Sequence, residues 1–138
     1  MSVPSFAGAV PLAGASVSAG FPSPAEDYLE RGIDFNAYLV ARPAATFAVR
    51  VRGDSMKGAG IHNGDILIVD RSLNATDGSV VVAVVDGEFT VKRLRVRGDR
   101  AFLCPENPDY RPIEVTDSES QIWGVATFAI HSLTRLSN

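Results

Sequence analysis

The chain has 138 residues, of which 46% are hydrophobic, and a formal net charge of -3 at pH 7. This length fits one ordinary domain, and the apolar fraction is sufficient for a hydrophobic core. Sixteen acidic residues outnumber thirteen basic ones, which argues against direct nucleic-acid binding because phosphate recognition leaves a basic surface. No stretch approaches the roughly 20 apolar residues that span a bilayer. We therefore expect a soluble protein that does not bind membranes.

Residues 1–25 carry no charged side chain and consist mostly of Ala, Gly, Ser, Val and Pro. This composition neither sustains a helix nor buries much surface. We predict a flexible amino-terminal arm over residues 1–25, followed by one domain over residues 26–138. An export signal is the alternative, since Val17-Ser18-Ala19 has the small-residue spacing of a secretory cleavage site. The segment lacks a basic region, however, and Pro and Gly interrupt its apolar stretch.

Two short helices are predicted where the domain begins. Ser23-Pro24-Ala25-Glu26 combines a cap residue, a first-turn proline and a capping-box glutamate. The first helix should continue through Tyr28 and Leu29 and end near Gly32. The second helix or turn begins at Asp34, and its apolar residues share one face: Phe35, Tyr38 and Leu39.

After residue 45 the pattern is that of strands, separated by turns such as Asn63-Gly64 and Asp86-Gly87. The runs of valine lack strict alternation, which indicates strands that are covered on both faces. We predict a mainly β domain, built as a compact bent sheet or partial barrel. The predicted strands are residues 46–51, 66–69, 79–85, 88–94, 101–104, 113–115 and 121–131.

Neither a disulfide nor a metal site is predicted. The single cysteine, Cys104, has no partner within the chain, and its apolar neighbours favour a small buried core residue. No group of Cys and His has the spacing of metal ligands, and no glycine-rich segment could cradle a phosphate. We expect no cofactor.

A tight polar turn, Gly53-Asp54-Ser55-Met56, follows the first predicted strand and places a serine at its tip. A serine hydroxyl is a poor nucleophile at neutral pH, so a catalytic Ser55 needs a base that takes its proton. The alternative is an ordinary turn, because Gly, Asp and Ser are common turn residues.

Lys92 is the best candidate for this base. A two-residue turn at Asp86-Gly87 pairs Lys92 with Val81, and the alternation of side chains gives Lys92 the same face as Thr90 and Leu94. Desolvation among such neighbours disfavours the ammonium ion and lowers the pKa of a lysine. The alternative is an amine that reaches water at a sheet edge, as most strand lysines do.

Other catalytic combinations have less support. His62 lies in a polar turn and His131 at the end of the last predicted strand, with no local feature that orients either ring. Carboxylate pairs such as Asp54 with Asp65 or Asp70 are interpreted as turn acids.

Several segments occur in an order that a known family shares: Gly53–Met56, Gly64–Asp70, Asp86–Leu94 and Pro105–Tyr110. Together they resemble the motifs of the LexA/UmuD group of self-cleaving Ser-Lys peptidases. The arm sequence Gly20-Phe21-Pro22-Ser23-Pro24-Ala25-Glu26-Asp27-Tyr28 makes the similarity greatest to UmuD and its plasmid-borne relatives. The resemblance covers about residues 19–130.

The resemblance implies that Ser55 is the nucleophile, Lys92 the general base, and Ala19-Gly20 the bond that the protein cuts in its own arm. It also implies that backbone N–H groups of the turn, at Asp54 and Ser55, hold the oxyanion. The same dipeptide recurs in the arm, but only Ala19-Gly20 is followed by the family's Phe-Pro-Ser-Pro. The other two copies are Ala7-Gly8 and Ala13-Gly14.

By the same resemblance, we expect a cytoplasmic homodimer in the SOS response that cleaves itself when a RecA-type recombinase filament on single-stranded DNA induces it. Its processed form is expected to be an accessory subunit of an error-prone, UmuC-like Y-family polymerase in translesion synthesis. Whether a chain cuts its own arm or its partner's stays open. Two other functions are considered: a soluble serine peptidase that resembles signal peptidases, and a non-catalytic β-rich interaction domain.

Overall fold

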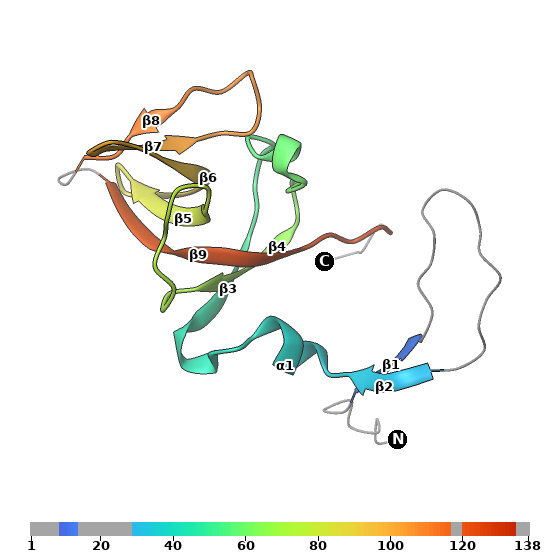
Figure 1. Ribbon diagram of the computed structural model, residues 1–138. Helices are drawn as coiled ribbons and strands as arrows, with labels where there is room; N and C mark the ends of the chain where they lie inside the picture. The colour runs from blue at the N-terminus through green and yellow to red at the C-terminus, as the bar shows by residue number, and fades with distance from the viewer. Residues whose placement is uncertain (1–8, 14–28, 117–119, 135–138) are drawn as a thin grey trace. The chain divides into compact units, whose positions relative to one another are not determined.

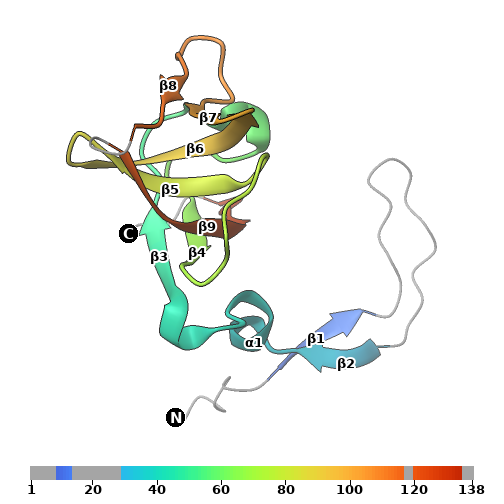
Figure 2. The same cartoon turned by 60° about the vertical axis from the view of Figure 1, so that its left-hand side comes forward.

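The computed structural model of the protein describes residues 9–13, 29–116 and 120–134. The chain divides into two units, residues 1–41 and 42–138, and each is described separately (Figures 1 and 2). The predicted boundary between arm and domain at residues 25 and 26 lies outside the described residues, as does the alternative export signal. That boundary stays a prediction.

The first unit contains a small antiparallel sheet of β1 (Val10–Ala13) and β2 (Leu29–Ile33). The prediction of a helix through Leu29 to Gly32 is therefore wrong, and β1 was not predicted. Capping signals act locally, whereas β2 takes its hydrogen bonds from a distant strand. A Cβ added at Gly32 would lie 2.4 Å from the Cβ of Ala9, so this glycine permits close approach of two chain segments.

The second predicted helix is confirmed as α1 (Phe35–Leu39). Asp34 is its N-cap residue, and its Oδ1 accepts a hydrogen bond from the N–H of Ala37 at 3.3 Å. A short polar side chain at this position satisfies a backbone donor that a helix start would otherwise leave without a partner.

The second unit is an antiparallel sheet of seven strands in the order β3-β4-β9-β5-β6-β7-β8. It confirms the mainly β fold, and within the described residues the bent sheet does not close into a barrel (Figure 1). Strand β9 joins the two halves, because one end pairs with β4 and the other with β5. The strands are β3 (Thr46–Arg50), β4 (Ile66–Asp70), β5 (Val80–Val85), β6 (Glu88–Arg97), β7 (Arg100–Cys104), β8 (Ile113–Glu114) and β9 (Ser120–Ile130). Two short 3-10 helices, Pro43–Ala45 and Lys57–Ala59, complete the unit.

The hairpin of β5 and β6 has the predicted register. Val85 pairs with Glu88 and Val81 with Lys92. The turn residues between the strands, Asp86 and Gly87, have φ angles of 52° and 81°, which are the left-handed values that a two-residue hairpin turn requires. The register places the Lys92 backbone opposite a fully buried valine.

Strand β5 is covered on both faces, as its unbroken apolar run predicted. Val81, Val82 and Ala83 are each at most 1% exposed, although successive residues of a strand point to opposite faces. Cys104, in contrast, is only partly buried. The prediction that it is a core residue is correct only in part, because it occupies the end of β7.

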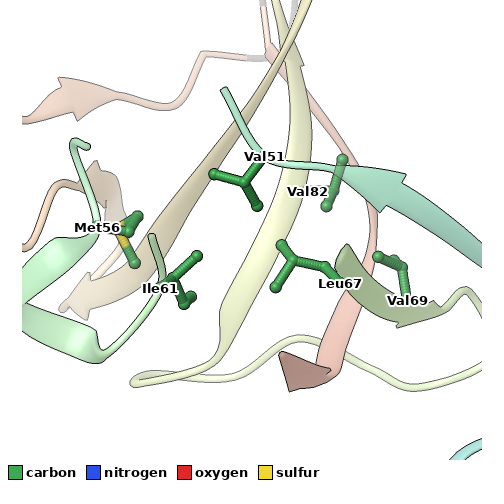
Figure 3. Close-up of a cluster of buried hydrophobic side chains, with 6 residues drawn as sticks. All are labelled: Val51, Met56, Ile61, Leu67, Val69 and Val82. Carbon is green, nitrogen blue, oxygen red and sulfur yellow. The ribbon is translucent and has the colours of Figure 1, made fainter. Parts of the chain in front are cut away.

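One buried cluster lies beneath the serine turn. Its residues come from β4, β5 and the segment that follows β3, and their side chains lie together in Figure 3. Val51 and Met56 belong to this cluster and lie on either side of Ser55 in the chain, so the turn is anchored to the core at both ends. The members are Val51, Met56, Ile61, Leu67, Val69 and Val82.

Candidate active site

The serine turn begins where β3 ends, and the segment between Ile61 and Asp65 holds its first residues. The N–H of Val51 donates to the carbonyl of Asp65 at 2.8 Å, and the N–H of Gly53 donates to Oδ1 of Asn63 at 2.8 Å. Gly53 has a φ of 90°, a conformation that glycine adopts without the steric cost of a side chain. The chain therefore turns at Gly53, after β3 has ended at Arg50, and presents Ser55 beyond the strand.

The loop of residues 105–110, which follows β7, holds the other side of the turn. The N–H of Glu106 donates to the carbonyl of Ser55 at 2.8 Å. The Nδ2 of Asn107 donates to the carbonyl of Asp54 at 2.9 Å, and Oη of Tyr110 donates to Oδ1 of Asp54 at 2.9 Å. The turn is thus fixed between two segments that are distant from it in sequence.

Lys92 reaches the serine from the middle of β6. Its Nζ lies 3.1 Å from Oγ of Ser55, 2.7 Å from Oγ1 of Thr90 and 3.1 Å from the carbonyl oxygen of Val91. The residue is buried, with 8% of its surface exposed. Of the two interpretations of Lys92, the structure favours the buried amine over one that reaches water.

Burial lowers the pKa of the Lys92 amine below its ordinary value of 10.5. Among the described residues no ion pair includes Lys92, so no carboxylate offsets the cost of desolvating its charge. A neutral amine has two N–H donors and one lone pair. The contacts of Nζ suit this form, since Thr90 and Val91 offer acceptors while Ser55 offers a hydroxyl proton.

Ser55 and Lys92 line a pocket with a volume of about 300 Å³. Its walls come from the end of β3, the serine turn, β5, β6 and the loop of residues 105–110. One wall includes Phe89, which is 60% exposed. The pocket is large enough for a few residues of an extended chain beside the serine hydroxyl.

The histidines occupy a different place. His62 and His131 contact each other, with ring centroids 4.8 Å apart, and neither is among the described residues that line the Ser55 pocket. Nδ1 of His131 lies 2.5 Å from Oδ1 of the buried Asp65. The sequence near His131 contains no feature that orients its ring, and in the structure the Asp65 carboxylate orients it. Asp65 lies far from His131 in sequence.

Two of the three predicted turn acids, Asp65 and Asp70, accept hydrogen bonds within turns. Asp65 accepts the N–H of His62 at 2.8 Å. Burial alone would raise the pKa of Asp65, but its hydrogen bonds from His62 and His131 outweigh this and lower it. Asp70 accepts from Ser72, whose hydrogen bonds lower the pKa of Asp70 together with the nearby Arg42. Both carboxylates therefore stabilise turns in the ionised form.

The remaining predicted site residues are only partly described. Ala19 and Gly20 lie outside the described residues. Asp54 and Ser55 carry the predicted oxyanion donors, and within the described residues no hydrogen-bond acceptor contacts the backbone N–H of either residue. Their role as an oxyanion site stays a prediction.

Three residues that contact Lys92 or the serine turn have no predicted role: Thr90, Asn107 and Tyr110. The signal for Thr90 was present, because it shares the face of Lys92 two residues away. The loop of residues 105–110 was noted as a motif, but its contacts with Asp54 depend on the fold.

Comparison with known proteins gives the class to which this site belongs. Residues 11–127 match the Peptidase S24-like family. The chain is 52% identical to Protein SamA of Salmonella typhimurium strain LT2 over 113 residues, which cover 82% of this chain and 79% of SamA. It is 48% identical to Protein MucA of Escherichia coli over 120 residues, or 85% of this chain and 79% of MucA. It is 46% identical to Protein ImpA of Escherichia coli over 128 residues, or 91% of this chain and 86% of ImpA.

The chain therefore belongs to the Peptidase S24-like family and, within it, is a UmuD-like member of the LexA/UmuD group. This is a family of self-cleaving serine peptidases, and its UmuD-like branch consists of SOS mutagenesis proteins. None of the helices in the described residues has the length and apolar character needed to cross a membrane.

Proposed function

We propose that this protein cuts its own arm between Ala19 and Gly20, with Ser55 as nucleophile and Lys92 as general base. The observation that carries the proposal is the 3.1 Å contact between Nζ of Lys92 and Oγ of Ser55, made by a lysine that is only 8% exposed. Burial favours the neutral amine, which is the form that accepts a proton.

In the first half of the reaction, the lone pair of Nζ takes the Ser55 hydroxyl proton while Oγ attacks the carbonyl carbon of Ala19. The negative charge moves to the carbonyl oxygen, where the N–H groups of Asp54 and Ser55 stabilise it. The bond to Gly20 then breaks, and the Lys92 ammonium gives its proton to the departing amine. An ester between Ser55 and Ala19 remains.

In the second half, Lys92 is neutral again and takes a proton from a water molecule that attacks the ester. Collapse of the second tetrahedral intermediate returns a proton to Oγ of Ser55 and releases a carboxylic acid at Ala19. The products are residues 1–19 and residues 20–138. The sum of the two halves is hydrolysis of one peptide bond.

We further propose that the processed protein is an accessory subunit of an error-prone translesion polymerase of the Y family. In this proposal the protein is a cytoplasmic homodimer, and a RecA-type recombinase filament induces cleavage by stabilising the docked arm. The similarity to SamA, MucA and ImpA supports this assignment, because all three belong to the same UmuD-like branch.

The dependence of the cleavage rate on pH tests the proposed chemistry. Only neutral Lys92 is active, so the initial rate should rise about tenfold per pH unit and level off once the pH exceeds the pKa of Lys92. Because burial lowers this pKa, the plateau should be reached below the ordinary value of 10.5. The measurement is the initial rate of cleavage of the purified protein from about pH 6 to 10.

A rate that does not change over this range would exclude deprotonation of Lys92 as the limiting event. A rate that still rises tenfold per unit up to the end of this range would show that burial does not lower the pKa of the amine below its ordinary value of 10.5. A filament that only docks the arm should multiply the rate equally at each pH. A filament that also excludes water from Lys92 should shift the midpoint to lower pH.

A further inference from the structure

Two peptide groups of the serine turn are fixed through their carbonyl oxygens. The carbonyl of Asp54 accepts from Nδ2 of Asn107 at 2.9 Å, and the carbonyl of Ser55 accepts from the N–H of Glu106 at 2.8 Å. In a planar trans peptide, the C=O and the N–H of the same unit point in opposite directions. The bond to Asn107 therefore also sets the direction of the Ser55 N–H, which points away from the amide of Asn107.

Asn107 is itself held in one orientation. Its Nδ2 donates to Asp54, and its Oδ1 accepts the N–H of Asp109 at 2.9 Å. Rotation of the amide by 180° would place oxygen against oxygen and N–H against N–H, so both hydrogen bonds favour the same orientation. The residue is 5% exposed, and inside a protein a satisfied polar group of this kind makes the surrounding backbone rigid.

The loop that carries Asn107 packs closely against the segment that follows the serine turn. The N–H of Gly58 donates to the carbonyl of Glu106 at 2.8 Å. A Cβ added at Gly58 would lie 2.6 Å from that carbonyl oxygen, so any other residue would push the loop outward. This close approach brings the Asn107 amide within hydrogen-bonding distance of Asp54.

We propose that Asn107 is a positioning residue for the oxyanion site. It holds the peptide between Asp54 and Ser55 so that the Ser55 N–H faces the position where the oxyanion forms. This inference rests on the proposed function, and it adds to that function the residue that pre-organises one of the two donors. Such a donor stabilises charge only as the tetrahedral intermediate forms. Asn107 should therefore change the maximal rate and leave the titration of Lys92 unaltered.

The test is the pH profile of self-cleavage for Asn107→Leu, which is neutral and similar in volume. Loss of one oxyanion donor costs about 10² to 10³-fold in rate, and a donor that is only misdirected should cost about 10 to 100-fold. We expect the plateau rate to fall by this factor while the pH midpoint stays at its wild-type value. Phosphonylation of Ser55 by a small fluorophosphonate, whose P=O group also needs the oxyanion donors, should slow by a similar factor.

Arg93→Lys is the matched control. Nε of Arg93 lies 2.6 Å from Oε1 of Glu106. This ion pair stabilises the loop of residues 105–110 and involves no residue of the serine turn. The lysine keeps the positive charge beside Lys92, and cleavage should stay within about threefold of the wild-type rate. Equal losses in Asn107→Leu and Arg93→Lys would contradict the proposal, because loosening of the loop would then suffice.

The proposal is also overturned if Asn107→Leu cleaves at the wild-type plateau rate. It is overturned if the variant's midpoint moves up toward the ordinary pKa of lysine, since this would mean that water has reached Lys92. If Asn107→Leu does not fold, Asn107→Ala is measured in the same way. The failure of the proposed function is recognised separately, because Ser55→Ala would then still cleave or still react with the fluorophosphonate.

Discussion

Replacement of Ser55 with alanine is expected to stop the release of residues 20–138. Loss of a serine nucleophile costs on the order of 10⁶-fold in rate, which leaves no detectable cleavage over hours. The fold should be retained, because the partly exposed hydroxyl lies above a core anchored by Val51 and Met56. Stability should change by no more than about 0.5 kcal/mol. Product masses over time and urea unfolding measure the two effects.

Ser72→Ala is the control for this substitution. Oγ of Ser72 donates to Oδ1 of Asp70 at 2.6 Å, so it is another turn serine with a defined hydrogen bond. Its loss should lower stability by about 1 kcal/mol and leave the cleavage rate unchanged. If Ser55→Ala released the same fragment as wild type, another group would have to be the nucleophile.

Lys92→Met should lower the cleavage rate by about 10² to 10⁴-fold, the usual contribution of a general base, and should also stabilise the protein at neutral pH. Folding lowers the pKa of Lys92 below the 10.5 expected in the unfolded chain. Between the two pKa values the unfolded state binds more protons, so wild-type stability rises with pH across this window. The advantage of methionine should therefore be largest below the folded pKa and disappear as the pH approaches 10.5.

Lys57→Met is the matched lysine control, since its side chain is exposed and is not among the described residues that line the pocket. It should retain both the cleavage rate and its pH dependence. Cleavage by Lys92→Met with the wild-type pH profile would exclude Lys92 as the base. A stability gain that did not change with pH would show that better packing, and not the removal of a buried charge, stabilises the variant.

The position of Lys92 could be predicted from sequence because the information is local. Asp86-Gly87 specifies a two-residue turn, the turn specifies the pairing of Val81 with Lys92, and alternation along the strand gives the face that Lys92 shares with Thr90. Each step spans only a few residues, and the structure has the same register. What the local pattern left open was whether the amine is buried, because this depends on what covers the strand.

The contacts that fix the turn could not be predicted in the same way. Asn107 and Asp54 are 53 residues apart, and Asp65 and His131 are 66 residues apart, so these pairs meet only after the sheet is assembled. The incorrect helix at Leu29 has the same origin. Its capping signals were local, and the pairing of β2 with β1 depends on a segment earlier in the chain.

The most direct measurement of self-cleavage is the intact mass of the purified wild-type chain after incubation at about pH 10, beside Ser55→Ala treated identically. The wild type should yield two masses, those of residues 1–19 and 20–138, and the variant should stay whole. An uncut wild-type chain would contradict self-cleavage. Fragments from a cut after Ala7 or Ala13 would contradict the assignment of Ala19-Gly20. If Ser55→Ala were cut at the same bond as the wild type, a contaminating protease and not Ser55 would be responsible for the cleavage.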